Sequence, residues 1–332
     1  MNIKEISKIA KVSQATVSLA LNNRPGVSEE TRYKILEIAS KYGYSKRSSN
    51  PKKNILFIKY IGSGAAVEQN GDFIARVIDS IEYASSNLGY TLIIKNIMET
   101  DFKSEIKAID YDEYAGIVFL GTEAKSEDIS SLKDISIPIV AVDNMFQKHD
   151  IDSVVMDNFD GIYKAVSYLV SLGHKKIGYL DSVIRFTNFD QRTEAFLKSM
   201  EEFGLDKNQM ILHVEPNLDG AYQDMLKHLK QVSGDMPTAF VGANDTIVIG
   251  AVKALKAYGM KIPNQISVIG FDDIPFCTMM DKPLTTIRVY KERMGELAVK
   301  LLDDKINNPS EETVKMLVTT KLIERESTAS II

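Results

Sequence analysis

From Ile55 onward, short runs of Ile, Val and Leu alternate with longer amphipathic stretches. Nearly continuous apolar runs of this length are typical of strands buried on both faces, which occur in parallel sheets covered by helices. The stretch 72–88 carries apolar residues at helical spacing and stops before Gly89. This alternation restricts the fold to the α/β class. The first predicted strands lie at 55–60, 91–97, 115–121 and 137–143.

The alternation then begins a second time. Predicted strands lie at 153–157, 176–182, 210–216, 238–244 and 267–273. Helices are expected between them, at 160–172, from about 190 to 203, from about 220 to 232, and at 246–258. Two consecutive sets of this kind predict two doubly wound lobes.

Polar residues stand where many of these predicted strands end. Ligands of doubly wound sheets bind beyond the carboxyl ends of the strands, so these positions are candidates for a binding site. The alternative is a purely structural role, in which an Asp or Asn at a strand end caps the helix that follows. The residues concerned are Asp143, Asp157, Asp181, Asn244, Asp272 and Asp273, with Asp245 next to Asn244.

Residues 2–44 have a different character and predict three short helices. Asn2 with Glu5 forms a capping box ahead of an apolar stripe, Ser13 can cap a helix at 14–21, and Ser28 can cap a third helix. Two short helices joined by a tight turn form a helix-turn-helix unit. The second helix begins with short hydroxyls and an amide that can reach phosphates and base edges in a major groove, unless they are only caps and solvated surface.

Charge separates this module from the rest of the chain. Residues 1–53 contain eleven basic and four acidic residues, a net charge of +7, whereas the whole chain carries −5. Residues 54–332 therefore carry −12. A basic head on an acidic body favours a nucleic-acid binder with a soluble regulatory domain, because phosphate neutralisation supplies most non-specific affinity.

The segment 45–54, SKRSSNPKKN, contains no apolar side chain and four basic ones. This composition predicts a linker. It can act as a basic tether along the DNA backbone or minor groove, or as a passive flexible spacer.

The head resembles the DNA-binding domain of the lactose/galactose-repressor (LacI/GalR) family. The similarity rests on the runs VSQATVSLALN at 12–22 and VSEETR at 27–32, and on the closing Gly43 and Tyr44. The resemblance implies that Gln14, Ala15 and Leu19 read bases. It implies phosphate contacts for Ser13, Thr16, Ser18 and Asn22, and basic Lys4 and Arg24 are expected to add sequence-independent affinity.

The chain departs from this family at several positions. Leu19 stands where a basic residue is common, and Lys11 and Ser7 replace a turn glycine and a buried alanine. The linker lacks the alanine and leucine of the family's hinge helix, so a minor-groove wedge is not expected.

The body is similar to the effector domain of the same family, which has the periplasmic-binding-protein-like type I fold. The matching runs include DNFDG at 157–161, AND at 243–245 and SVIGFDD at 267–273. The resemblance implies a ligand cleft between the lobes. The residues it implies as ligand contacts are Phe73, Arg192, Asn244 and Asp272, with Asp143 as a weaker match.

The residue types at these positions suit a sugar-binding cleft independently of the family resemblance. An arginine fork beside carboxylates can bind vicinal hydroxyls, and an aromatic face can stack on a sugar ring. Phe186 and Phe189 could also line the cleft or belong to the core. Arg192 could instead pair with Glu194 or Asp190 on its own helix.

Other classes of function receive little support. The chain has a single cysteine, Cys277, its four histidines show no metal spacing, and it contains neither a G-x-S-x-G nor a Walker A motif. Neither a metal nor a cofactor is therefore expected. No apolar run approaches the ~18 residues of a membrane span, and the N-terminus lacks a signal peptide, so we expect a cytoplasmic protein with no membrane partner.

We therefore expect a helix-turn-helix domain at 1–44, a basic linker at 45–54 and a two-lobed ligand-binding and dimerisation domain at 55–332. The N-lobe should comprise about 55–157 and 288–315, and the C-lobe about 158–287 and 316–332. The expected function is that of a homodimeric transcriptional repressor on an operator in double-stranded DNA, modulated by a small carbohydrate-like effector. The alternatives are a sugar-binding receptor or an α/β enzyme without a DNA function.

Overall fold

The computed structural model describes residues 3–21, 26–41, 53–64, 71–231 and 236–331. It divides into two compact units, a head up to Lys52 and a body from Lys53 to Ile332. Nearly all of the linker at 45–54 lies outside the described residues. Among the described residues, no helix is both long and apolar enough to span a membrane.

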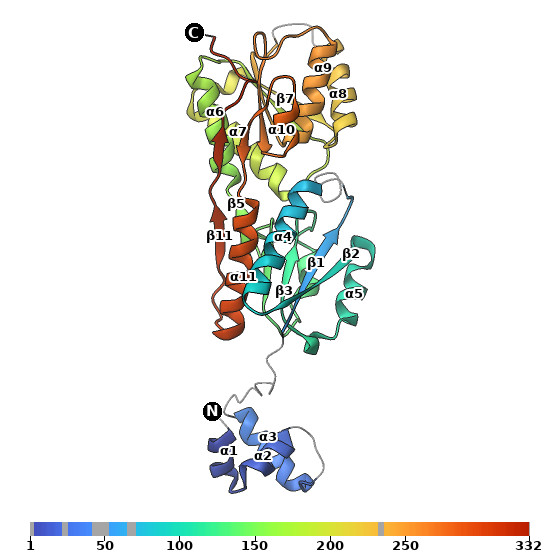
Figure 1. Cartoon of the computed structure of the whole chain (residues 1–332), viewed down its shortest axis with the longest axis vertical. Coiled ribbons are helices and arrows are strands. Elements are labelled where there is room, and N and C mark those ends of the chain that lie inside the picture. Colours follow the sequence, from blue (N-terminus) through green and yellow to red (C-terminus); the bar gives the residue numbers. More distant parts are fainter. Residues whose placement is uncertain (1–2, 22–25, 42–52, 65–70, 232–235, 332) are drawn as a thin grey trace. The chain divides into compact units, whose positions relative to one another are not determined.

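The described part of the head contains the three helices expected from the sequence: α1 (Ile3–Ala10), α2 (Gln14–Leu21) and α3 (Glu29–Lys41) (Figure 1). They enclose a small core of Ile6, Ala10, Val17, Ala20, Ile35 and Ala39. Lys11 stands where the family that the head resembles usually has a turn glycine, and it adopts a left-handed φ of 58° between α1 and α2. A tight turn thus joins the two helices at the cost of a strained backbone.

The first lobe of the body is built on a parallel sheet. Among the described residues this sheet has six strands in the order β11-β5-β4-β3-β1-β2. The strands are β1 (Asn54–Ile61), β2 (Thr91–Met98), β3 (Tyr114–Leu120), β4 (Ile139–Val142), β5 (Asp152–Met156) and β11 (Lys315–Val318). Its α-helices are α4 (Gly71–Asn87), α5 (Phe102–Ala108) and α11 (Lys291–Asn307).

The second lobe repeats this plan with one antiparallel edge strand. Its sheet, again counted over the described residues, has six strands in the order β12-β10-β9-β8-β6-β7, and β12 pairs antiparallel with β10. The strands are β6 (Ile177–Ser182), β7 (Gln209–Val214), β8 (Ala239–Gly242), β9 (Ser267–Asp272), β10 (Thr285–Arg288) and β12 (Lys321–Ile323). The α-helices are α6 (Asn158–Ser171), α7 (Thr187–Glu202), α8 (Leu218–Gln231), α9 (Asp245–Ala257) and α10 (Phe276–Met279).

The central strands of both lobes are buried, as the apolar runs predicted, whereas the run at 91–97 forms the edge strand β2, in which only Ile97 is buried. Every residue of β6, β8 and β9 is buried, because helices cover both faces of the sheet. In the first lobe α11 packs on α4, where a side chain at Gly295 would place its Cβ 1.9 Å from Ser80 Oγ (Figure 1). Glycine is required at this close approach of two helices.

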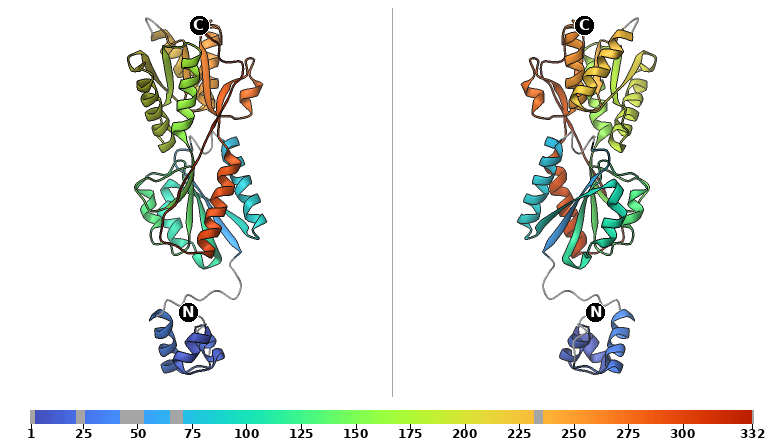
Figure 2. Two further views of the ribbon diagram at one scale, coloured as in Figure 1. Left: turned by 90° about the vertical axis from the view of Figure 1, so that its left-hand side faces the viewer. Right: turned by 90° about the vertical axis from the view of Figure 1, so that its right-hand side faces the viewer.

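In the described chain, three connections join the lobes: β5 to α6, β10 to α11, and β11 to β12 (Figure 2). The third lies later than the sequence predicted. The expected boundary at residue 315 falls at the start of β11, which pairs with β5 and therefore belongs to the N-lobe as far as Val318. The helix expected from about residue 190 begins earlier, at Thr187.

Candidate functional site

The N-terminal end of α2 presents polar side chains to solvent. Val17 and Ala20 face the core of the head and fix the orientation of the helix. The opposite surface begins with exposed Ser13, Gln14 and Ala15, followed by half-exposed Thr16, Ser18 and Leu19.

Ser13 and Thr16 are also engaged in a helix cap. Ser13 Oγ accepts a hydrogen bond from the backbone N–H of Thr16 at 3.0 Å and lies 2.8 Å from Thr16 Oγ1. Both residues thus have a structural role in addition to their exposure. Lys4 on α1 is exposed, whereas Asn22 and Arg24 lie outside the described residues.

The body contains a small cavity where the carboxyl ends of both sheets meet. Its volume is about 30 Å³, which is room for about two water molecules. All five predicted ligand residues line it, together with Phe186 and Phe189. The complete lining is Phe73, Ile74, Thr122, Asp143, Met156, Phe186, Asn188, Phe189, Arg192, Asn244 and Asp272.

On the N-lobe wall the central polar group is the carboxylate of Asp143. Thr122 Oγ1 donates to Asp143 Oδ2 at 2.6 Å, and Asn188 Nδ2 donates to Asp143 Oδ1 at 3.0 Å. Burial is the main cause that raises the pKa of Asp143, to about 6, with the nearby charge of Asp272 adding to it. Asp143 also adopts a left-handed φ of 67°, the kind of strain that proteins concentrate at functional positions.

On the C-lobe wall the guanidinium of Arg192 is buried and held on several sides. Its Nε donates to Asn158 Oδ1 at 2.7 Å and its Nη1 to the carbonyl of Ala243 at 2.6 Å. Its Nη2 lies 3.5 Å from Asp272 Oδ1. The group also lies over the ring of Phe271, 3.8 Å from its centre.

These contacts decide between the two interpretations of Arg192. The candidate partners on its own helix are occupied elsewhere, because Glu194 pairs with Lys198 and Asp190 with Arg185. Arg192 therefore faces the cavity and pairs with Asp272, instead of forming a surface ion pair.

The other polar residues at strand ends divide between the cavity and structural duties. Asn244 lines the cavity and also caps α9, since its Oδ1 accepts from the N–H of Ile247 at 2.9 Å. Asp157 caps α6 through the N–H of Asp160. Asp181 bonds to Arg185 and Thr193. Asp273 is held by two guanidinium groups, those of Arg288 and Arg325, which lower its pKa against the effect of its burial.

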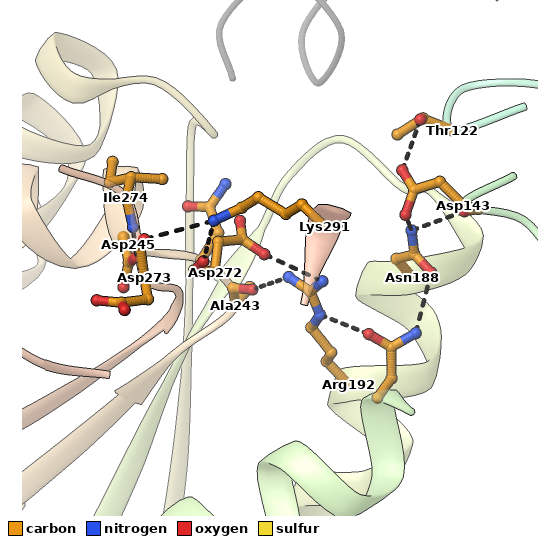
Figure 3. A network of polar contacts seen from close by, with 12 residues as sticks. Thr122, Asp143, Asn188, Arg192, Ala243, Asp245, Asp272, Asp273, Ile274 and Lys291 are labelled. Carbon is orange, nitrogen blue, oxygen red and sulfur yellow. Dashed lines mark hydrogen bonds and ion pairs between the residues drawn. The ribbon is translucent and has the colours of Figure 1, made fainter. Parts of the chain in front are cut away.

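A continuous polar network crosses from one lobe to the other. Asn188, at the start of α7, donates to Asp143 of the N-lobe and accepts from Asn158 Nδ2 at 2.9 Å (Figure 3). Asn158 in turn accepts from Arg192, which reaches Asp272. The two asparagines thus link the acidic walls of the cavity.

Sequence reasoning did not assign Thr122 and Asn188 to the cavity lining, nor Asn158 and Lys291 to the contacts that hold Arg192 and Asp272 in its wall. Lys291 begins α11 of the N-lobe, but its ammonium donates to the backbone carbonyl of Asp272 in the C-lobe at 2.5 Å (Figure 3). The ammonium also lies 5.7 Å from the centre of the Phe73 ring. The position of Asn158 within the run DNFDG was the available signal. The sequence around Lys291 gave no such signal, because the contacts of Lys291 depend on how the two lobes pack and not on its neighbours in the sequence.

Asp245 lies behind the C-lobe wall as a fully buried carboxyl group. Its Oδ1 accepts from Thr286 Oγ1 and its Oδ2 from the N–H of Ile274. Burial, with a contribution from the charge of Asp272, raises the pKa of Asp245 to about 7. Within the described residues, no group of three or more His, Cys, Asp or Glu residues could hold a metal ion.

Two family models match the chain. Residues 2–46 match bacterial regulatory proteins of the lacI family, and residues 166–328 match the periplasmic binding protein-like domain. Solved structures of similar fold include the CelR–cellobiose complex (TM-score 0.72, 19% identity, covering 98% of this chain and 99% of that one). The lac repressor dimer bound to operator and the anti-inducer ONPF gives a TM-score of 0.72 at 20% identity over 99% of both chains.

Curated relatives match over almost the whole length. The HTH-type transcriptional repressor PurR of Pasteurella multocida is 31% identical over 334 residues, covering 99% of this chain and 98% of the relative. A probable HTH-type transcriptional repressor, ExuR of Bacillus subtilis, is 28% identical and covers 98% of both chains. These relatives are transcriptional repressors and not enzymes. The chain belongs to the lacI family of bacterial regulatory proteins.

Proposed function

We propose that this protein is a homodimeric repressor that binds operator DNA through α2 and changes its operator affinity when a small polyhydroxylated ligand occupies the cavity between the lobes. The observation that carries the proposal is the cavity itself. Its donors and acceptors come from both lobes. A cavity of about 30 Å³ is too small for a sugar ring, so the lobes must move apart to admit the ligand, and ligand binding is therefore linked to their relative position.

For the DNA contacts, we assign base reading to Gln14, Ala15 and Leu19 and phosphate contacts to Ser13, Thr16, Ser18 and Asn22. The exposure of Gln14 and Ala15 at the start of α2 supports this assignment. Leu19 can offer only apolar contact, for example to a thymine methyl group. Lys4 and Arg24 supply charge without sequence preference.

For the ligand contacts, we assign Arg192, Asp272 and Asp143 as the hydrogen-bonding groups and Phe73 as a stacking wall. Asn244 contributes from the start of α9. An arginine and carboxylates held this close can bind adjacent hydroxyls of one sugar ring, while the aromatic side chains cover its apolar face. The site would take a carbohydrate or a related polyol.

For assembly, we assign the dimer interface to the body. Large apolar side chains stay exposed on α4 and on the edge strand β2, with Tyr83 64% and Ile94 51% exposed. Association of a second copy over this face would remove them from water. A two-fold dimer then presents two copies of α2 to successive major grooves about 34 Å apart.

The coupling follows from how the chain is connected. The linker enters the body at Lys53, immediately before β1 of the N-lobe. A ligand that binds one arrangement of the lobes more tightly than another shifts the population of N-lobe positions, and this alters the spacing of the two heads. Because its target is chromosomal DNA, the protein acts in the cytoplasm.

The test is a screen of the full-length protein by thermal shift against sugars, polyols and nucleosides, followed by operator titrations with each hit. A ligand at 100 times its dissociation constant should add ~2.7 kcal/mol to the stability of the body. The proposal requires that the same ligand also changes operator affinity. Ligand binding without any effect on operator affinity would contradict it.

A further inference from the structure

We propose that the effector is an anionic polyhydroxy compound, a sugar acid or a sugar phosphate, whose anionic group binds the ammonium of Lys291. This proposal rests on the proposed function and adds a charged group to its ligand. Lys291 carries the proposal because its ammonium is buried, forms no ion pair within the described chain, and lies against the wall of the cavity.

Lys291 is a buried cation that only neutral groups hold. The residue is 4% exposed, and its ammonium donates to the backbone carbonyls of Asp272 at 2.5 Å and of Asp273 at 3.4 Å. Carbonyl oxygens accept hydrogen bonds from an ammonium, but they do not neutralise its charge. A buried charge without an opposite charge is costly, so an anion brought to this position is favoured.

The carboxylates nearest to this ammonium in the sequence of contacts already have cationic partners. The carboxylate of Asp272 lies 3.5 Å from Arg192 Nη2. The carboxylate of Asp273 is shared between Arg288 and Arg325, each at 2.6 Å. Three guanidinium groups thus face two carboxylates before the ammonium is counted.

Two further acidic residues stand close by and do not balance the ammonium. Glu292, the next residue on α11, pairs with Arg76 and is 59% exposed, so water screens its charge. Asp245 lies behind the C-lobe wall, where burial raises its pKa to about 7, and near neutral pH it is only partly ionised. The surroundings of Lys291 therefore keep an excess of positive charge.

The opposite wall of the cavity has the other polarity. Among the described residues, the hydrogen-bond donors to the Asp143 carboxylate are neutral, the hydroxyl of Thr122 and the amide of Asn188. Figure 3 shows Asp143 and the Lys291 ammonium on opposite sides of the Arg192 guanidinium. A ligand that donates a hydroxyl to Asp143 and places its anionic group at Lys291 matches both ends.

Lys291 lies between the cavity and a larger pocket. Its ammonium bonds to Asp272 and lies 5.7 Å from the centre of the Phe73 ring, and both of these residues line the cavity. The same lysine lines a pocket of about 490 Å³ together with Asp273 and Arg288. The side chain of Lys291 therefore stands where a ligand that enters from this pocket would reach the cavity.

Opening of the lobes gives the ammonium to the ligand. The helix α11, which Lys291 begins, belongs to the N-lobe, whereas the two carbonyls that hold its ammonium belong to the C-lobe. The lobes must move apart to admit a ligand, and this movement takes the ammonium away from both carbonyls. The anionic group of the ligand then replaces them and balances the charge. A charge-assisted hydrogen bond of this kind corresponds to about 10- to 100-fold in affinity.

The experiment is a calorimetric titration of the full-length protein at pH 7.5 with matched sets of ligands. Each set contains a neutral sugar, its uronic acid and its phosphate ester, for example D-glucose, D-glucuronate and glucose 6-phosphate. In the responding set an anionic member should bind about 10- to 100-fold more tightly than the neutral sugar. The comparison of the two anions identifies the group as a carboxylate or a phosphate.

Two outcomes of this titration count against the proposal in different ways. A neutral sugar that binds as tightly as both of its anionic counterparts, or more tightly, overturns the inference but leaves the proposed function intact. If no compound of any kind binds, the proposed function fails and the inference fails with it. Neither outcome depends on whether a variant folds.

Substitutions of Lys291 test whether this residue supplies the preference. Lys291→Met removes the charge and keeps the length of the side chain, so the ratio of the neutral to the anionic dissociation constant should fall by at least about tenfold. Lys291→Arg keeps the cation and should retain most of the preference. Lys300→Met, at an exposed position on the same helix, should leave the ratio unchanged. An unchanged ratio in a folded Lys291→Met protein overturns the inference.

Discussion

Replacing Arg192 with methionine should destabilise the body strongly, because the substitution leaves the buried carboxylate of Asp272 without its guanidinium. The Nη2 to Oδ1 distance is 3.5 Å, and both side chains are 4% exposed. The change also removes the donors to Asn158 Oδ1 and to the carbonyl of Ala243. Removing one partner of a buried ion pair costs about 3–5 kcal/mol.

This loss should lower the melting temperature by roughly 8 °C, taking about 2 °C per kcal/mol for a unit of this size. Scanning calorimetry of the full-length protein measures the shift. Arg293→Ala is the matched control, since Arg293 pairs on the surface with Glu296 and is 52% exposed. The control should change stability by less than ~0.5 kcal/mol.

A double-mutant cycle with Asp272→Asn tests the cause of the loss. The double variant contains no buried carboxylate at this position, so it should be more stable than the sum of the two single changes implies, by about 2 kcal/mol. Additivity within ~0.5 kcal/mol would refute the view that Arg192 and Asp272 form one buried charged unit.

Three further predictions concern pH, DNA reading and helix packing. Burial raises the pKa of Asp245 to about 7, so ionisation of this carboxyl group opposes folding. As the pH falls from about 7 toward about 4, wild type should therefore gain stability relative to Asp245→Asn, by up to ~1.4 kcal/mol per pH unit. Urea unfolding at a series of pH values measures this difference. In operator titrations Gln14→Ala should change the order of preference among base-substituted operators, whereas Lys4→Ala should weaken all of them equally and reduce the salt slope by about one; an unchanged order for Gln14→Ala would count against α2 as the reading helix. Gly295→Ala should cost about 1–3 kcal/mol, because its Cβ would lie 1.9 Å from Ser80 Oγ, while Gly71→Ala, which meets no atom within 4 Å, should leave thermal stability nearly unchanged.

The sequence predicted the lobes well because long apolar runs carry their own structural signal. Strands buried on both faces need no long-range information to be recognised, and β6, β8 and β9 lie where such runs occur. The polar residues at strand ends were also informative, since parallel strands bring their carboxyl ends to one edge. Asp143, Asn244 and Asp272 come together at the cavity for this reason.

The errors arose where tertiary contacts outweigh local pattern. The start of α7 was placed at about residue 190, but Phe186 at its N-cap makes no side-chain cap bond, so no capping signal marked Thr187 as the first residue. That displacement left Asn188 in a loop, whereas it lies on the helix and bridges the lobes. The end of the N-lobe at Val318 depends on pairing between β11 and β5, which are far apart in sequence.

At the strand ends, sequence alone could not separate ligand-binding groups from structural ones. Asp157, Asp181 and Asp272 all follow apolar runs, yet Asp157 caps a helix and Asp181 bonds to Arg185. Asp272 faces Arg192. The difference depends on which guanidinium or backbone N–H each carboxylate meets, and only the packing of the helices determines that.

The central claim is that a ligand in the cleft controls operator binding, and the most direct measurement is an operator titration by fluorescence anisotropy with and without the ligand found in the screen. Wild type should change its dissociation constant for the operator by at least about tenfold on saturation, a typical allosteric coupling. Asp272→Asn should still bind the operator and should lose the response. A response that persists undiminished in Asp272→Asn would contradict the claim, and so would an operator affinity in wild type that stays constant while the ligand binds.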